Sequence, residues 1–146
     1  PFVKSLMQGV TNRLNEKSSA GSIRSILGRK CRFDLWEPDS FAMNKALPYR
    51  DAVKEYGETT RLKRAYTYKA LNRLIQASAA DMTKQSMVNI YKAGKLPMIQ
   101  IHDEIAMSVK DKEEALEIAK IMENAVPLEV PNSCDTELGP SWGEAK

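Results

Sequence analysis

The sequence is poor in the residues that build disulfide frameworks, zinc sites and membrane spans. Its 146 residues include two cysteines and one histidine, and Cys31 and Cys134 lack the close spacing of zinc ligands. We therefore expect two free thiols in a reducing compartment. No apolar run is long enough to cross a bilayer, and the N-terminus lacks the features of a secretory signal peptide. These absences predict an intracellular protein that is neither secreted nor bound to a membrane.

The composition is that of an ordinary globular domain. Hydrophobic residues make up 42% of the chain and charged residues 28%, which is typical of one folded domain with a modest core. The net charge is +3, but residues 1–100 hold 18 Lys and Arg against 8 Asp and Glu, whereas residues 101–146 hold 4 against 11. This distribution suits a phosphate-binding surface followed by a metal site. Alternatively, the acids of residues 111–124 form only the solvated face of a surface helix.

The most informative motif is His102-Asp103-Glu104. It lies between the apolar segments 96–101 and 105–109, in which side chains alternate as they do on paired strands. We predict a β-hairpin whose turn carries adjacent carboxylates, which is a suitable place for a catalytic metal ion. A single histidine is more often structural, so His102 is a candidate only because of its neighbours.

Apolar periodicity predicts two elements in the N-terminal part. Residues 1–16 should form a helix, and residues 22–27 and 30–34 a short hairpin around Gly28-Arg29, where glycine allows a positive φ. The stripe that the helix is expected to bury consists of Val3, Leu6, Met7, Val10 and Leu14.

Residues 35–57 are predicted to form an irregular segment that contains one helix at 49–56. Pro38 and Pro48 argue against a central strand there, because proline lacks the N–H that a ladder needs. The role of this segment could be partner contact, DNA contact or simple packing.

Residues 60–93 contain no proline or glycine and predict one long helix that ends before Gly94. One of its faces would carry Tyr68, Asn72 and Gln76 in line. Amide donors in such a row suit the minor groove of DNA, where every base pair offers an acceptor in a similar place. The alternative is an ordinary solvated helix face.

Basic residues at the start of this predicted helix and in the N-terminal hairpin are candidates for binding phosphates as charge-assisted donors. A solvated surface is the competing interpretation. The residues are Arg61, Lys63 and Arg64 near the helix start, and Arg24, Arg29, Lys30 and Arg32 in the hairpin.

The last third of the chain predicts a capped helix and further strands. Asp111 should cap the helix, with Glu114 capping reciprocally three residues later. Residues 126–130 and 134–138 are expected to add antiparallel strands to the His102-Asp103-Glu104 hairpin. The predicted fold class is therefore α+β. The buried stripe of the helix would be Ala115, Ile118, Ala119 and Met122.

Five motifs in order resemble the C-terminal end of a family A DNA polymerase, the class of bacterial DNA polymerase I, in its phage and organellar branch. The resemblance covers nearly the whole chain. The motifs are Gly28-Arg29-Lys30, Asn72 and Gln76 within LNRLIQASAAD, QIHDEI at 100–105, VPLEV at 126–130, and the closing GPSWGEAK.

The resemblance implies a partial polymerase palm: an antiparallel sheet with the catalytic hairpin, packed against long helices, plus a remnant of the fingers-proximal region. Residues 1–60 would be the fingers- and palm-proximal part, and residues 61–146 the C-terminal palm with a DNA-facing helix. The implied activity is template-directed nucleotidyl transfer to a primer 3′-hydroxyl by two Mg²⁺ ions, in a cell's cytoplasm or nucleoid or in an organelle.

The resemblance also implies roles for single residues. Asp103 would be a catalytic metal ligand, with Glu104 beside it as an outer ligand or as a group that tunes the metal position. Primer-template DNA would be contacted by His102, Asn72 and Gln76. Tyr68 departs from the family, whose members often have Arg or His there. Arg29, Lys30 and Arg64 are the further DNA-binding candidates.

The family's first catalytic aspartate and its nucleotide-gripping helix have no counterpart in these residues. We therefore expect a fragment, one subunit of a split enzyme or a truncated version, inactive without an N-terminal remainder that binds the dNTP. Two alternatives stay open. The chain could be a non-catalytic DNA-binding or assembly module with a palm fold, or part of a single-subunit RNA polymerase, although Glu104 after Asp103 favours DNA synthesis.

Overall fold

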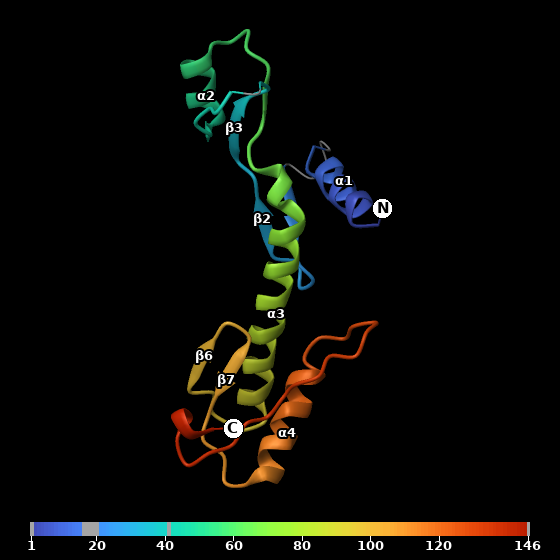
Figure 1. Ribbon diagram of the computed structural model, residues 1–146, viewed down its shortest axis with the longest axis vertical. Coiled ribbons are helices and arrows are strands. Elements are labelled where there is room, and N and C mark those ends of the chain that lie inside the picture. Colours follow the sequence, from blue (N-terminus) through green and yellow to red (C-terminus); the bar gives the residue numbers. More distant parts are fainter. Residues whose placement is uncertain (1, 16–20, 41, 146) are drawn as a thin grey trace. The chain divides into compact units, whose positions relative to one another are not determined.

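A computed structural model describes residues 2–15, 21–40 and 42–145 of the chain. Helices and small antiparallel sheets alternate along it (Figure 1), which confirms the predicted α+β class. The chain forms two compact units, residues 1–78 and 79–146. Their boundary falls within helix α3 (Ala70–Lys92). The predicted functional division near residue 60 concerns fingers and palm and stays a prediction.

The core of the N-terminal unit lies between helix α1 (Phe2–Asn15), the hairpin β1 (Ser22–Arg24) and β2 (Lys30–Arg32), and the start of α3. Its buried members are Leu14, Ile23, Phe33 and Ala70, with Val10, Cys31 and Leu74 packed against them.

Helix α1 forms as predicted within the described residues, but its predicted buried stripe is wrong. Leu14 is fully buried and Val10 is half-buried, whereas Val3, Leu6 and Met7 are exposed. Helical spacing indicates which side chains share a face, but only a neighbouring element can cover that face. In this unit the hairpin covers the C-terminal end of the helix, where Leu14 joins the core.

The predicted N-terminal hairpin is confirmed. Ile23 pairs with Cys31 in an antiparallel register, and Gly28 in the turn has a φ of +85°, as expected for a residue without a Cβ. The Ser25 hydroxyl accepts a hydrogen bond from the Arg29 N–H at 3.0 Å, so one side chain closes the turn.

Residues 35–64 contain a sheet that the sequence did not predict. Strand β3 (Leu35–Pro38) lies in its centre, between β4 (Leu47–Pro48) and β5 (Leu62–Arg64). The expectation that proline excludes a central strand was wrong, because β4 pairs only with Leu35 and Trp36, so no ladder bond on that side needs the missing N–H of Pro38. Helix α2 (Tyr49–Tyr56) follows as predicted.

The long helix begins about ten residues later than predicted. Residues 62–64 pair with β3 instead, and a 3-10 turn, η2 (Thr67–Lys69), leads into α3. Tyr66, with a left-handed φ of 61°, separates strand from helix. Pairing with a distant strand thus overrides local helix propensity. The predicted end is confirmed, since α3 stops at Lys92 and Gly94 has a φ of +78°.

The C-terminal unit contains the hairpin β6 (Ile99–Ile101) and β7 (Glu104–Ala106), and helix α4 (Lys112–Glu123). Asp111 caps α4 as predicted by accepting the Glu114 N–H at 2.8 Å. Ala115, Ile118 and Ala119 are buried, and Met122 is half-buried.

The strands expected at 126–130 and 134–138 are absent from the described part of this unit, where β6 and β7 form a sheet of two strands. Pro127 and Pro131 lack the N–H groups that a regular ladder would use. The segment is tied to α4 instead, because Glu123 accepts the Cys134 N–H at 3.0 Å. Its partial burial raises the pKa of the Cys134 thiol.

Within the described ranges, no helix is both long and apolar enough to cross a membrane.

Candidate functional site

The tip of hairpin β6–β7 is a two-residue turn. Ile101 pairs with Glu104, which leaves His102 and Asp103 between the strands. His102 has a φ of 53°, in the left-handed region that residues with a Cβ enter uncommonly. The Gln100 side-chain amide donates to the His102 carbonyl oxygen. Strand pairing and this bond therefore hold His102 in an unfavourable backbone conformation. Such strained conformations are frequent at functional sites.

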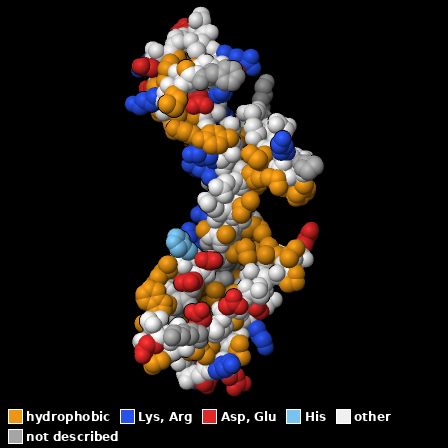
Figure 2. All heavy atoms as spheres, in the orientation of Figure 1, with side chains coloured by type: hydrophobic (Ala, Val, Ile, Leu, Met, Phe, Trp, Pro, Cys, Tyr) orange, Lys and Arg blue, Asp and Glu red, His pale blue; other side chains and the backbone are white. Residues whose placement is uncertain are grey.

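Asp103 and Glu104 present two carboxylates at this tip. Both residues are exposed, Asp103 in the turn and Glu104 as the first residue of β7. Neither carboxylate forms a hydrogen bond or ion pair with another described residue, so both are available to a cation. Figure 2 shows several acidic side chains on the visible face of this unit.

This pair fits part of a magnesium site. Mg²⁺ is usually held by one or two carboxylates, with water and substrate phosphates completing the shell. Among the described residues, no group of three or more His, Cys, Asp or Glu could hold a metal ion. Asp103 and Glu104 can therefore supply ligands to a shared site, but the described residues do not assemble a complete set for two ions.

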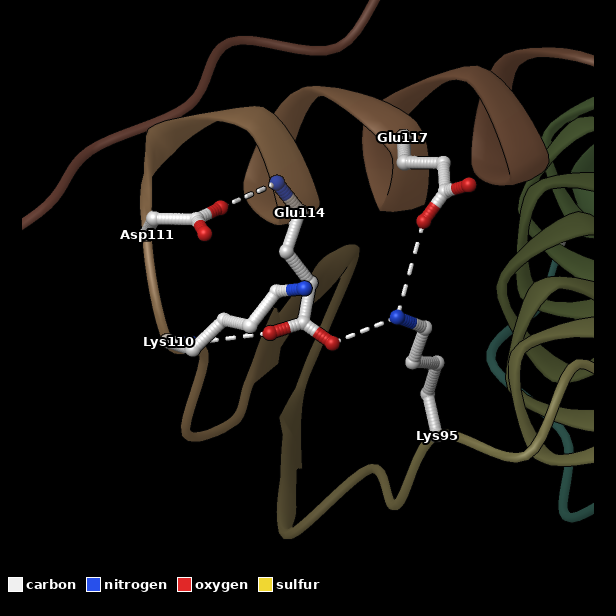
Figure 3. A network of polar contacts seen from close by, with 5 residues as sticks. All are labelled: Lys95, Lys110, Asp111, Glu114 and Glu117. Atoms are coloured by element: carbon white, nitrogen blue, oxygen red, sulfur yellow. Dashed lines mark hydrogen bonds and ion pairs between the residues drawn. The ribbon is translucent and has the colours of Figure 1, made fainter.

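A polar network joins the two ends of the hairpin to α4 (Figure 3). Lys95, which precedes β6, donates to Glu114 Oε1 at 2.5 Å, and the N–H of Lys110, which follows β7, donates to Glu114 Oε2 at 2.8 Å. Lys95 also lies 3.5 Å from Glu117.

These contacts shift the pKa values of Glu114 and Lys95 in the directions that favour their charged forms. The hydrogen bond from the Lys110 N–H, followed by that from Lys95, lowers the pKa of Glu114. The hydrogen bond to Glu114 raises the pKa of Lys95 despite partial desolvation. The sequence predicted that Glu114 would cap the helix reciprocally with Asp111, but its carboxylate accepts the N–H of Lys110 instead. Its link to Lys95, 19 residues away, could not be read from local spacing.

The candidate DNA-facing residues belong to the N-terminal unit. Asn72 and Gln76 lie one turn apart on α3 and are exposed, as predicted. Tyr68 is also exposed but lies in the 3-10 turn η2, with Lys69 Nζ 5.5 Å from its ring centre. The row therefore begins before the α-helix, and its DNA contacts stay predictions.

The candidate phosphate-binding residues differ in whether their side chains already form hydrogen bonds within the protein. Lys30 is exposed, while Arg24 donates to the Gly28 carbonyl oxygen and Arg29 to that of Ala77, both at 2.8 Å. Arg64 is half-buried and donates to the Phe33 carbonyl oxygen at 2.9 Å. Lys30 and Arg32, both exposed, are thus the hairpin candidates most open to a phosphate.

Arg61, Lys63 and Arg64 were expected at a helix start, and this was wrong because the three residues belong to β5 or directly precede it. Arg61 and Lys63 each lie 3.4 Å from a carboxylate oxygen of Asp39. Asp39 thus partly neutralises this basic cluster within the fold.

Comparison with known proteins gives one consistent result. Residues 1–144 match the family model described as DNA polymerase family A. The DNA-directed DNA polymerase of Pseudomonas phage M6 is 39% identical over 145 residues, which are 99% of this chain and 18% of that protein. DNA polymerase I of Lactococcus lactis subsp. cremoris is 31% identical over 157 aligned residues, 100% of this chain and 15% of that protein. The chain thus spans less than a fifth of the length of these relatives.

Proposed function

Because this chain belongs to DNA polymerase family A, we propose that it forms part of a DNA-directed DNA polymerase that extends a primer 3′-hydroxyl on a template. The family match agrees with the resemblance inferred from the five sequence motifs. The observation that carries the proposal is the hairpin tip, where Asp103 in the turn and Glu104 at the start of β7 are exposed within the family's matched region.

This reaction requires carboxylates that can bind Mg²⁺, and the hairpin tip presents two. Bound Mg²⁺ would neutralise charge on the transferring phosphoryl group and activate the attacking hydroxyl. In this chain Asp103 would be the inner ligand and Glu104 the ligand or tuning group beside it. His102, held in its turn by Gln100, would contact the primer strand.

Residues of the N-terminal unit would hold the duplex. Asn72 and Gln76 would donate hydrogen bonds in the minor groove, where a correct pair offers an acceptor in a sequence-independent position. Lys30 and Arg29 would contact phosphates, which positions the duplex without reading it. Tyr68 would extend the row of DNA contacts from η2. Arg64 would add positive potential while its guanidinium stays bound within the unit.

The described residues supply one carboxylate pair, so the complete site requires ligands from the rest of the polymerase. We therefore propose that the chain alone is inactive. Its partners would be primer-template DNA, a dNTP, and the N-terminal remainder carrying the first catalytic aspartate and the nucleotide-binding helix.

The test is primer extension by a full-length polymerase containing this chain, with Asp103→Ala compared with Glu113→Ala. Glu113 is also an exposed carboxylate, but it lies on α4 rather than in the hairpin. Loss of extension in the Asp103 variant alone, with DNA binding retained, supports the proposal. Full extension by the Asp103 variant contradicts it.

A non-catalytic DNA-binding module is the second candidate, and the charge of the N-terminal unit favours it. Residues 1–78 contain 15 Lys and Arg against 7 Asp and Glu, which suits a phosphate-tracking surface. Such a module would bind DNA equally well with or without Asp103 and would extend no primer in any mixture.

A further inference from the structure

We propose that Glu114 is a positioning residue that clamps both ends of hairpin β6–β7 to helix α4 and thereby fixes Asp103 and Glu104 at its tip. This inference rests on the proposed function, because the position of the tip matters only if its carboxylates act in the reaction.

The clamp uses both oxygens of one carboxylate (Figure 3). Glu114 Oε1 accepts from Lys95 Nζ at 2.5 Å, four residues before β6, and Oε2 accepts from the Lys110 N–H at 2.8 Å, four residues after β7. The Glu114 N–H is in turn bound by Asp111 at 2.8 Å. One side chain therefore ties the entry and the exit of the hairpin to the first turn of α4.

The hairpin has little else to hold it among the described residues. A two-stranded hairpin is marginally stable by itself in water, and all three residues of β6 are exposed. In β7 only Ile105 and Ala106 are half-buried. Its backbone ladder is extended at the base by the Met98 N–H, which donates to the Ala106 carbonyl oxygen. Packing is thus sparse near the tip, and the connection at the base limits how far the tip can move.

Glu114 is better suited to this role than its acidic neighbours. Its side chain is 15% exposed and that of Lys95 is 23% exposed, so water screens their ion pair less than it screens a surface pair. Glu117 is 68% exposed and lies 3.5 Å from Lys95. Glu113 shares the first turn of α4 and is exposed. Glu113 therefore has the same favourable position in the helix dipole without reaching the hairpin.

The test uses hydrogen exchange measured by mass spectrometry on the full-length polymerase, in peptides covering residues 98–106 and 112–120, together with the Mg²⁺ concentration at half-maximal primer extension. Glu114→Ala is compared with Glu113→Ala, which controls for the dipole. Asp111→Ala serves as a second control, because it removes the helix cap while leaving Lys95 and Glu114 in place.

The clamp predicts that Glu114→Ala speeds exchange in residues 98–106 roughly tenfold, the effect of losing charge-assisted hydrogen bonds. Glu113→Ala should leave this exchange within about twofold, and Asp111→Ala should act mainly on residues 112–120. The Mg²⁺ midpoint should rise several-fold in Glu114→Ala only, and Glu114→Gln, which keeps an acceptor for the Lys110 N–H, should restore part of both effects.

Unchanged exchange in residues 98–106 of Glu114→Ala overturns the clamp. Faster exchange with an unchanged Mg²⁺ midpoint overturns its role in positioning the carboxylates. A wild-type enzyme that extends no primer contradicts the proposed function instead, and the exchange data then decide the clamp by themselves.

Discussion

The guanidinium of Arg64 lies over the ring of Trp36, with 4.5 Å between its central carbon and the ring centroid. The two residues are paired in the register of β3 and β5, and Arg64 also donates to the Phe33 carbonyl oxygen. Gly21, with a left-handed φ of 69°, passes beside Arg64, and a Cβ there would lie 2.3 Å from the guanidinium and displace it. Arg64 therefore connects three segments of the N-terminal unit.

This arrangement predicts that Arg64→Ala lowers the free energy of unfolding of the N-terminal unit. The loss should be about 2 kcal/mol, from one cation–π contact and one charge-assisted hydrogen bond. Arg61→Ala should lower this free energy by under about 0.5 kcal/mol, because the ion pair of Arg61 with Asp39 involves an exposed arginine side chain that water screens. Native-state hydrogen exchange across residues 22–38 measures both, and equal effects of the two variants would contradict the structural role of Arg64.

Asp103→Ala should lower the rate of primer extension by the assembled polymerase roughly a thousandfold or more. A metal ligand contributes several kcal/mol to the stabilisation of the transition state. DNA binding and the thermal unfolding midpoint should stay near the wild-type values, because the exposed Asp103 carboxylate has no described partner in the fold. Single-turnover extension and DNA titration check both parts. A decrease in extension that only follows a loss of folding would count against a catalytic role.

Asn72 and Lys30 should affect DNA binding in different ways. Lys30→Ala removes a phosphate contact and should reduce the slope of log K against log salt by about 1. Asn72→Ala or Gln76→Ala should leave that slope unchanged, weaken binding at the primer end and lower the discrimination against mismatched pairs. Binding titrations at several salt concentrations, with matched and mismatched primer ends, separate the two. The assignment of Asn72 to the minor groove fails if its variant changes the salt slope as Lys30→Ala does.

The Lys95–Glu114 pair should stabilise the C-terminal unit over a wide pH window. Folding lowers the pKa of Glu114 below its ordinary value of 4.5, so its contribution is present above that pH and is lost as the pH falls through the folded value. Folding raises the pKa of Lys95 above 10.5, so its contribution is present below that pH and is lost as the pH rises through the folded value.

The thermal unfolding midpoint of wild type should therefore exceed that of Glu114→Gln by a constant amount from about pH 6 to 9. This difference should shrink in acid below about pH 4. The other charged groups near Glu114 are Lys110, Asp111 and Glu117, and their protonation is common to both proteins. A difference that grows in acid would contradict the pairing.

Motifs with short-range causes were predictable from the sequence. The turn at His102 and Asp103, the glycine at position 28 and the Asp111 cap each follow from residues within four positions of one another. The family assignment also came from such local motifs, and it is confirmed.

The remaining elements depended on partners distant in sequence. Residues 62–64 form a strand because β3 is there to pair with them, and helix propensity alone could not reveal it. Likewise, helical spacing grouped Val3 with Leu14, but only Leu14 meets the core. The tie between Lys95 and Glu114 was missed for the same reason, because it joins two elements across 19 residues.

The most direct test of this account is Mg²⁺-dependent primer extension by this chain alone, by the rest of the polymerase alone, and by the two mixed, each repeated with Asp103→Ala. We expect extension in the mixture only, and its loss when Asp103 is replaced. Extension by this chain alone, or extension by the mixture that does not depend on Asp103, would contradict the claim that the hairpin tip supplies an essential part of a shared catalytic site.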